Sequence, residues 1–161
     1  MQIRKAKIED IEKVAQLMER NGYDREGAVR RASSIGRPDR CLFILDNAAE
    51  VMGYAGIKKQ SEQFPIDFDT STSQFAQILW VGVHYDFRHK GFGSKLVRAC
   101  DDVALKFERQ NIVLVCREEV ISFYQGIEYR EIGSYIDERL RLRFVMVKDI
   151  SKARHSSYRT H

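Results

Sequence analysis

The residues best suited to chemistry lie together between Ile78 and Lys95, in the stretch ILWVGVHYDFRHKGFGSK. Its apolar beginning is typical of a strand buried on both faces, and a polar turn follows. The segment from Arg88 to Gly93 then opens a helix with the pattern R-x-x-G-x-G. The first N–H groups of a helix have no intrahelical partner, and the helix dipole adds positive charge there. This turn therefore predicts a site for a pyrophosphate or another group of several phosphates.

Two features of the turn strengthen that interpretation, and one alternative remains. Gly91 and Gly93 carry no Cβ, so a ligand can approach the backbone closely. Arg88, Lys90 and Lys95 add full positive charges. The patterns of nucleotide-triphosphate loops and of dinucleotide folds are both absent from the sequence. An ordinary basic turn between a strand and a helix would match the same six residues, so the surrounding elements must decide.

Composition indicates a soluble protein of one domain. The chain has 161 residues, of which 43% are hydrophobic and 31% charged. We expect a single domain over residues 1–150 and a flexible basic tail over residues 151–161. No stretch has the length of a membrane span, and the N-terminus lacks the apolar core of a signal peptide. The three single cysteines favour reduced thiols in the cytoplasm over disulfides or a metal site.

The positive charge of the chain is concentrated in its tail. The formal net charge is +4, and the tail holds three basic residues and no acidic one. Without it, 24 basic residues stand against 23 acidic ones. The body is thus nearly neutral, which argues against a partner that is a nucleic acid.

Hydrophobic spacing and turn signals predict a mixed α/β sheet. The expected order is β-α-α-β-β-β-α-β-α-β-β. The expected strands are 2–7, 41–45, 51–59, 75–84, 111–116, 129–135 and 139–147, and the expected helices are 8–18, 25–35, 91–109 and 120–125. The stretch from Glu62 to Ser73 is expected to be a mobile loop. The helix that starts at Gly91 follows the carboxyl end of its strand, where open α/β sheets bind ligands.

With this order, the sequence resembles the GNAT superfamily of N-acetyltransferases, which transfer an acetyl group from acetyl-CoA to an amine. The strand end Val81-Gly82-Val83, followed by Arg88 to Gly93, matches the family pattern V-x-V, turn, R/Q-x-x-G-x-G/A. A second match is the strand Asn111 to Cys116, followed by a helix containing Phe123-Tyr124. The resemblance extends over nearly the whole chain. It implies a mixed, mostly antiparallel sheet that is splayed at the cofactor site.

The resemblance also implies roles for individual residues. Those expected to bind acetyl-CoA, and CoA as its product, are Val81, Gly82, Val83, Arg88, His89, Lys90, Gly91, Phe92, Gly93 and Ser94. Tyr124 matches the tyrosine that protonates the departing thiolate, although a purely structural core aromatic is the alternative. The N–H of Val83 is a candidate donor to the oxyanion of the reaction. No metal is implied.

The general base is the least defined part of the expected site. Some family members use a glutamate on the central strand, and Gln77 occupies that position here. His84 is our candidate instead, because histidine changes its protonation nearest to neutral pH. A histidine turned toward solvent is equally compatible with the sequence. Weaker candidates are a chain of waters and the carboxylates Asp86, Glu118 and Glu119.

Two positions depart from the family pattern. Arg117 stands where many relatives have an asparagine that contacts the cofactor arm or the backbone beside it. Glu128 replaces a glycine in the turn after the tyrosine helix. The first change leaves a cofactor contact open, and the second alters the turn more than the chemistry.

The acceptor is not specified by the sequence. A primary amine of a small molecule is the first expectation, with a protein N-terminus or a lysine as the competitor. A second class is a module that binds acetyl-CoA without turnover. Asp67 and Asp69 could attract a cationic amine. Arg139, Arg141 and Arg143 alternate with apolar residues, which predicts three arginines on one face of a strand. A homodimer through the last strand is a further expectation from the family.

Overall fold

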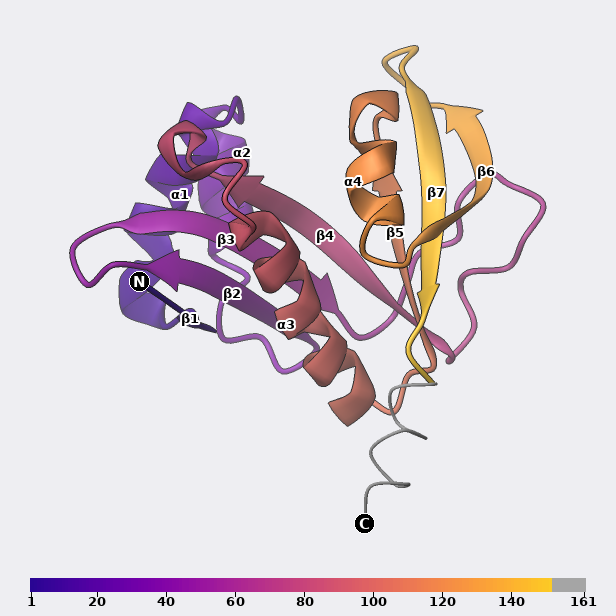
Figure 1. Ribbon diagram of the computed structural model, residues 1–161, viewed down its shortest axis with the longest axis horizontal. Coiled ribbons are helices and arrows are strands. Elements are labelled where there is room, and N and C mark those ends of the chain that lie inside the picture. The colour runs from indigo at the N-terminus through magenta and orange to yellow at the C-terminus, as the bar shows by residue number, and fades with distance from the viewer. Residues whose placement is uncertain (152–161) are drawn as a thin grey trace. The chain divides into compact units, whose positions relative to one another are not determined.

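The computed structural model describes residues 1–151, and Figure 1 shows its elements. The helices and longer strands follow the order predicted from the sequence, with short 3-10 helices between some of them. The elements are β1 (Gln2–Lys5), η1 (Ile8–Asp10), α1 (Ile11–Arg20), α2 (Arg25–Ala32), β2 (Arg40–Asp46), β3 (Val51–Lys58), β4 (Phe75–Val83), η2 (Tyr85–Phe87), α3 (Phe92–Lys106), β5 (Asn111–Cys116), η3 (Glu118–Val120), α4 (Ile121–Gln125), β6 (Arg130–Ile136) and β7 (Leu142–Asp149).

The strands form a seven-stranded mixed sheet in the order β1-β2-β3-β4-β5-β7-β6. Strands β4 and β5 are parallel, with Phe75, Ala76 and Gln77 paired to Asn111, Ile112 and Val113. The pairs β1–β2, β2–β3, β5–β7 and β6–β7 are antiparallel. The predicted α/β class with a mixed sheet is thereby confirmed.

The chain divides into two compact units, and each is interleaved in sequence with the other. The first unit comprises residues 1–58 and 78–103, and the second comprises residues 59–77 and the chain from residue 104 onward. The predicted basic tail lies outside the described residues from position 152 onward. The proposed boundary of a single domain at residue 150 stays a prediction.

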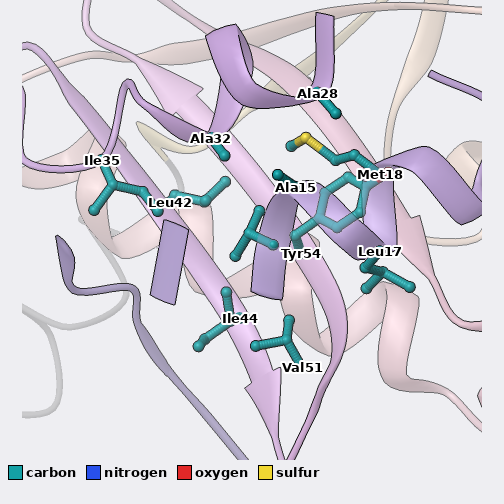
Figure 2. Packing of buried hydrophobic residues seen from close by; sticks show 11 residues of the cluster. Ala15, Leu17, Met18, Ala28, Ala32, Ile35, Leu42, Ile44, Val51 and Tyr54 are labelled. Atoms are coloured by element: carbon teal, nitrogen blue, oxygen red, sulfur yellow. The ribbon is translucent and has the colours of Figure 1, made fainter. Parts of the chain in front are cut away.

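The core of the first unit lies between α1, α2 and the strands β2 and β3. Apolar residues at helical spacing place one side of α1 in this core, as the 3.6-residue period requires. Figure 2 shows the ring of Tyr54, from β3, among these side chains. The buried members of the cluster are Val14, Ala15, Leu17, Met18, Ala28, Ala32, Ile35, Leu42, Ile44, Val51 and Tyr54. This core fixes both the Tyr54 ring and the last turn of α1.

Helix boundaries differ from the prediction where the backbone leaves the helical region. Helix α1 begins at Ile11 because Ile8–Asp10 forms a 3-10 turn. Helix α3 begins at Phe92 and not at Gly91, because Gly91 has a φ of +83°. The side chain of Asp24 accepts a 2.6 Å hydrogen bond from the Gly27 N–H and thereby caps the start of α2.

The core of the second unit joins β5, β7 and the start of β4. Its buried cluster is Phe64, Phe75, Val113, Val145 and Val147. The segment from Glu62 to Ser73 has no helix or strand, as predicted, but hydrogen bonds hold it. Buried Gln77 accepts a 3.0 Å hydrogen bond at Oε1 from the Glu62 N–H, and Arg109 donates to the carbonyls of Lys59 and Ser73.

The predicted stripe of arginines on the last strand is wrong. Strand β7 begins at Leu142, so Arg139 and Arg141 lie in the turn before it. The Asp137 carboxylate binds both residues: its Oδ1 accepts hydrogen bonds from the backbone N–H groups of Arg139 and Arg141 at 2.9 and 3.0 Å. Its Oδ2 also accepts from Nε of Arg141 and of Arg143 at 2.9 and 3.0 Å. Alternation alone missed this turn because an aspartate that organises a hairpin overrides the period of two.

This cluster predicts that the stability of the hairpin depends on pH. The Arg141 N–H and the Arg143 guanidinium, with the other donors, hold the pKa of the Asp137 carboxyl far below its usual range. The ionised carboxylate therefore stabilises the fold above the pKa of the unfolded chain, about 3.9, and the stabilisation is lost as the pH falls toward the folded-state pKa. Asp137→Asn should lower the unfolding temperature at pH 7, and the difference from wild type should shrink below about pH 4.

Thermal unfolding followed by circular dichroism between pH 2 and pH 8 measures this difference. Glu138→Gln, which neutralises the exposed neighbouring carboxylate, is the matched control and should change little. A difference between wild type and Asp137→Asn that is the same at every pH would contradict a contribution from the charge.

Candidate active site

The loop between β4 and α3 has a backbone suited to anion binding. His89 and Gly91 both have left-handed conformations, with φ of +62° and +83°. A left-handed residue among right-handed ones turns successive N–H groups toward one point, which makes a concave anion site. The first backbone hydrogen bond of α3 runs from Lys95 N to Gly91 O at 3.2 Å, so the preceding N–H groups begin the helix without intrahelical partners. Loop and helix start thus present their N–H groups together.

Basic side chains surround this loop. Arg88, Lys90 and Lys95 are all exposed. The Lys90 ammonium lies 5.4 Å from the ring centroid of Phe87, and that of Lys95 lies 5.7 Å from the centroid of Phe92. Aromatic faces attract cations at such distances and limit their motion. The ammonium groups of Lys90 and Lys95 are therefore held near aromatic rings on either side of the loop.

Arg88 is anchored to the backbone at the end of β4. Its Nε donates to Val83 O at 2.9 Å, and its Nη2 donates to Oδ1 of Asn21 at 3.4 Å. The amide of Asn21 in turn donates from Nδ2 to the Tyr54 hydroxyl at 3.3 Å. Burial raises the pKa of Tyr54 to about 12, so this hydroxyl stays protonated at neutral pH. A chain of hydrogen bonds thus joins the β4 end to the core.

Gly82 lies where this chain meets the strand. A Cβ at this position would be 2.4 Å from both Cζ and the hydroxyl oxygen of Tyr54 and 2.6 Å from Nδ2 of Asn21. Real Cβ atoms do not approach heavy atoms so closely, so only glycine fits. Sequence reasoning missed both Asn21 and Tyr54. The available signal was Gly82 itself, because a glycine inside a strand often marks the close approach of another group.

The end of β4 is held to the neighbouring strand. Val81, Gly82 and Val83 are half-buried, and the His84 N–H donates to Met52 O on β3 at 2.7 Å. The Val83 carbonyl already accepts from Arg88. A carbonyl has two lone pairs, so this bond leaves capacity for one more.

The geometry of His84 bears on its predicted role as base. The Nδ1 atom of His84 accepts a hydrogen bond from the Asp86 N–H at 3.2 Å and lies 3.8 Å from Oδ2 of Asp86. Its ring stacks on Tyr85 with centroids 4.7 Å apart, and only 11% of its side chain is exposed. A neutral imidazole has one lone pair, and here Nδ1 directs it at a backbone N–H. His84 therefore caps the turn, and it can accept a proton at Nδ1 only when that hydrogen bond opens.

Tyr124 belongs to the second unit, whereas the other predicted site residues belong to the first. It lies on α4 and is 8% exposed. Its ring makes edge contacts with Phe123 and Tyr129, with centroids 4.9 and 5.7 Å away. Glu128, which follows this helix, has a φ of +77°. It thus adopts the left-handed conformation that the glycine of the family pattern would favour.

The described part of the chain contains neither a candidate metal site nor a candidate membrane-spanning helix. Among residues 1–151, no group of three or more His, Cys, Asp or Glu side chains could hold a metal ion. Over the same residues, no helix is long and apolar enough to cross a membrane.

The fold and the loop together define the class of protein. A mixed sheet, with a turn suited to anion binding between a central strand and its helix, is the arrangement that we expect for a CoA-binding acetyltransferase. The model of the acetyltransferase (GNAT) family matches residues 8–128. The chain belongs to this family, whose members are acetyl-CoA-dependent N-acetyltransferases.

Solved structures share the fold at low identity. An aminoglycoside 6′-N-acetyltransferase complexed with coenzyme A has a TM-score of 0.77 at 14% identity, covering 93% of this chain and 97% of that one. A variant of the spermidine N-acetyltransferase SpeG from Vibrio cholerae has a TM-score of 0.70 at 15% identity, covering 94% of this chain and 96% of that one. The ribosomal-protein-S18-alanine N-acetyltransferase from Escherichia coli has a TM-score of 0.70 at 16% identity, covering 92% of this chain and 93% of that one. A comparison with curated protein sequences gave no match.

Replacing Gly82 or Gly91 by alanine should lower the free energy of unfolding by different amounts. Gly82→Ala forces the new Cβ onto buried Tyr54 and should destabilise the protein by about 2 to 3 kcal/mol. The Cβ of Gly91→Ala meets no atom within 4 Å, so the left-handed backbone alone should cost about 1 kcal/mol. Urea unfolding of the two variants measures both values. Equal losses, or a larger loss at position 91, would contradict the packing of Tyr54 against β4.

Proposed function

We propose that the protein transfers the acetyl group of acetyl-CoA to a primary amine of a small molecule, by direct attack of the amine on the thioester. The observation that carries this proposal is the backbone of residues 88–94, where two left-handed residues and a helix start gather N–H groups beside three cations. Such a site suits the negative charge of a pyrophosphate.

The loop residues fit the phosphate part of the cofactor. The N–H groups from Arg88 to Ser94 would bind phosphate oxygens, with the charges of Arg88 and Lys90 assisting. Gly91 leaves its surroundings open, since a Cβ there would meet no atom within 4 Å. The backbone of Val81, Gly82 and Val83 would pair with the pantetheine arm, as an added strand pairs with a sheet edge.

The chemistry requires a donor for the oxyanion, an acid for sulfur and a base for the amine. The amine nitrogen attacks the carbonyl carbon of the acetyl-CoA thioester, a C–N bond forms as the C–S bond breaks, and CoA leaves as a thiolate that takes up a proton. The Val83 N–H is the proposed donor to the carbonyl oxygen, and the Tyr124 hydroxyl gives its proton to the leaving sulfur. His84 Nδ1 is the proposed acceptor of the ammonium proton, after release of its bond to the Asp86 N–H.

Relatives of similar fold support the choice of acceptor. Two of the proteins named above are an aminoglycoside N-acetyltransferase and a spermidine N-acetyltransferase, and both of these acceptors are small amines. The third acts on an alanine of a ribosomal protein. A protein N-terminus or lysine is therefore the alternative acceptor. A module that binds acetyl-CoA without turnover is the alternative from another class, and a homodimer stays a prediction.

The test of this function begins with the cofactor. Thermal unfolding with CoA, with acetyl-CoA and without ligand should show a rise in unfolding temperature. A ligand at a hundredfold excess over its dissociation constant stabilises the folded state by about 2.7 kcal/mol. Release of free thiol is then measured with a panel of small amines and of peptides with free N-termini or lysines. The proposal fails if millimolar CoA leaves the unfolding temperature unchanged, or if peptides but no small amine give turnover.

Tyr124→Phe tests the acid of the reaction. The variant keeps the buried ring, so CoA affinity and stability should stay near those of wild type. Loss of the proton donor should lower kcat about a hundredfold. Tyr129→Phe removes a hydroxyl from the neighbouring ring and is the matched control, with kcat expected within about threefold of wild type. A Tyr124→Phe enzyme with unchanged kcat would remove Tyr124 from the mechanism.

A further inference from the structure

The side chain of Arg88 has a fixed orientation although it is exposed. Two of its nitrogens are used within the protein, Nε for the Val83 carbonyl and Nη2 for the Asn21 amide. A guanidinium has five N–H donors, so Nη1 and one N–H of Nη2 remain for another acceptor. The residue stands at the first position of the anion-binding loop. Its free donors are therefore directed by the two bonds that it makes.

The orientation of Asn21 is set from three sides. Its backbone N–H ends α1 through bonds to Leu17 O and Met18 O at 3.0 and 3.1 Å. Since a guanidinium only donates, the oxygen of the amide must face Arg88, and the nitrogen then faces the Tyr54 hydroxyl. Tyr54 is 1% exposed and packed in the core. The amide is thus a rigid link between the core and Arg88.

This link meets the strand at the point where Arg88 binds it. Asn21 and Tyr54 lie against Gly82, and Arg88 binds the carbonyl of Val83, the next residue. The side chains of Asn21, Tyr54 and Arg88, from separate parts of the sequence, therefore meet at two consecutive residues of β4. Such an arrangement removes the freedom of a long side chain before any ligand binds.

We propose that Asn21 is a positioning residue for cofactor binding: held by Tyr54, it keeps the Arg88 guanidinium ready for a phosphate group. The inference rests on the proposed function, because the phosphate belongs to CoA. An arginine without this support loses its rotamer freedom only when the ligand binds. Ordering one such side chain weakens binding by about three- to tenfold.

Asn21→Leu tests the inference, since leucine has a similar volume and no hydrogen-bonding atoms. The dissociation constant for CoA, from calorimetry, should rise about three- to tenfold. The constant for pantetheine, which carries no phosphate, should stay unchanged when measured by ligand-observed NMR. A purely structural role would change both ligands alike. Gln16→Leu, on an exposed position of the same helix, is the matched control and should change neither constant.

Two further variants separate support from disproof. In an Arg88→Gln background, Asn21→Leu should cause no additional loss, because the two residues act as one unit. If Asn21→Leu does not fold, Tyr54→Phe removes the same support and should weaken CoA binding in the same direction.

The outcomes distinguish this inference from the proposed function. A wild-type protein that binds no CoA overturns both. CoA binding that Asn21→Leu leaves unchanged, or weakens equally for CoA and pantetheine, overturns the inference alone. Additive losses in the double variant overturn it as well.

Discussion

The structure must hold several N–H groups of the loop 88–94 with their positive ends directed to the same place before a ligand neutralises them. Dipoles that converge repel one another, so a loop of this kind is stable only when rigid neighbours define its path. The left-handed residues His89 and Gly91 set the turn, and the first turn of α3 continues it. Arg88 fixes the entry by its bond to Val83. The core beneath Tyr54 therefore supports a surface loop that contributes little stability of its own.

Local patterns predicted the element order, and long-range contacts escaped them. The β4–α3 segment was recognisable because an apolar run, a glycine turn and a helical period follow one another directly. The contacts of Asn21 with Tyr54 and with Arg88 span 33 and 67 residues, and no local period encodes them. The prediction of an arginine stripe was wrong for the opposite reason. Arginines and apolar residues do alternate in this stretch, but Asp137 folds it into a turn.

Gln77 has a structural role at the position where the family resemblance led us to look for a base. The residue is 7% exposed, and its carboxamide oxygen accepts the Glu62 N–H, so it anchors the segment that precedes β4. A carboxylate there could accept the same bond but would have to lose hydration while charged. The amide is neutral at every pH, so this anchor is indifferent to protonation. The residue that resemblance marks as a missing base thus has a structural task that suits an amide.

The interleaving of the two units has a consequence for biosynthesis. The first unit needs residues 78–103 in addition to residues 1–58, and residues 59–77 of the second unit are made between them. On the ribosome, helices α1 and α2 and strands β1 to β3 emerge well before the end of β4 that packs on Tyr54. The core of the first unit can therefore be completed only after residues 78–103 have left the exit tunnel. No single cut in the chain yields either unit free of residues of the other, and a cut inside residues 59–77 separates the sequence of each unit into two fragments.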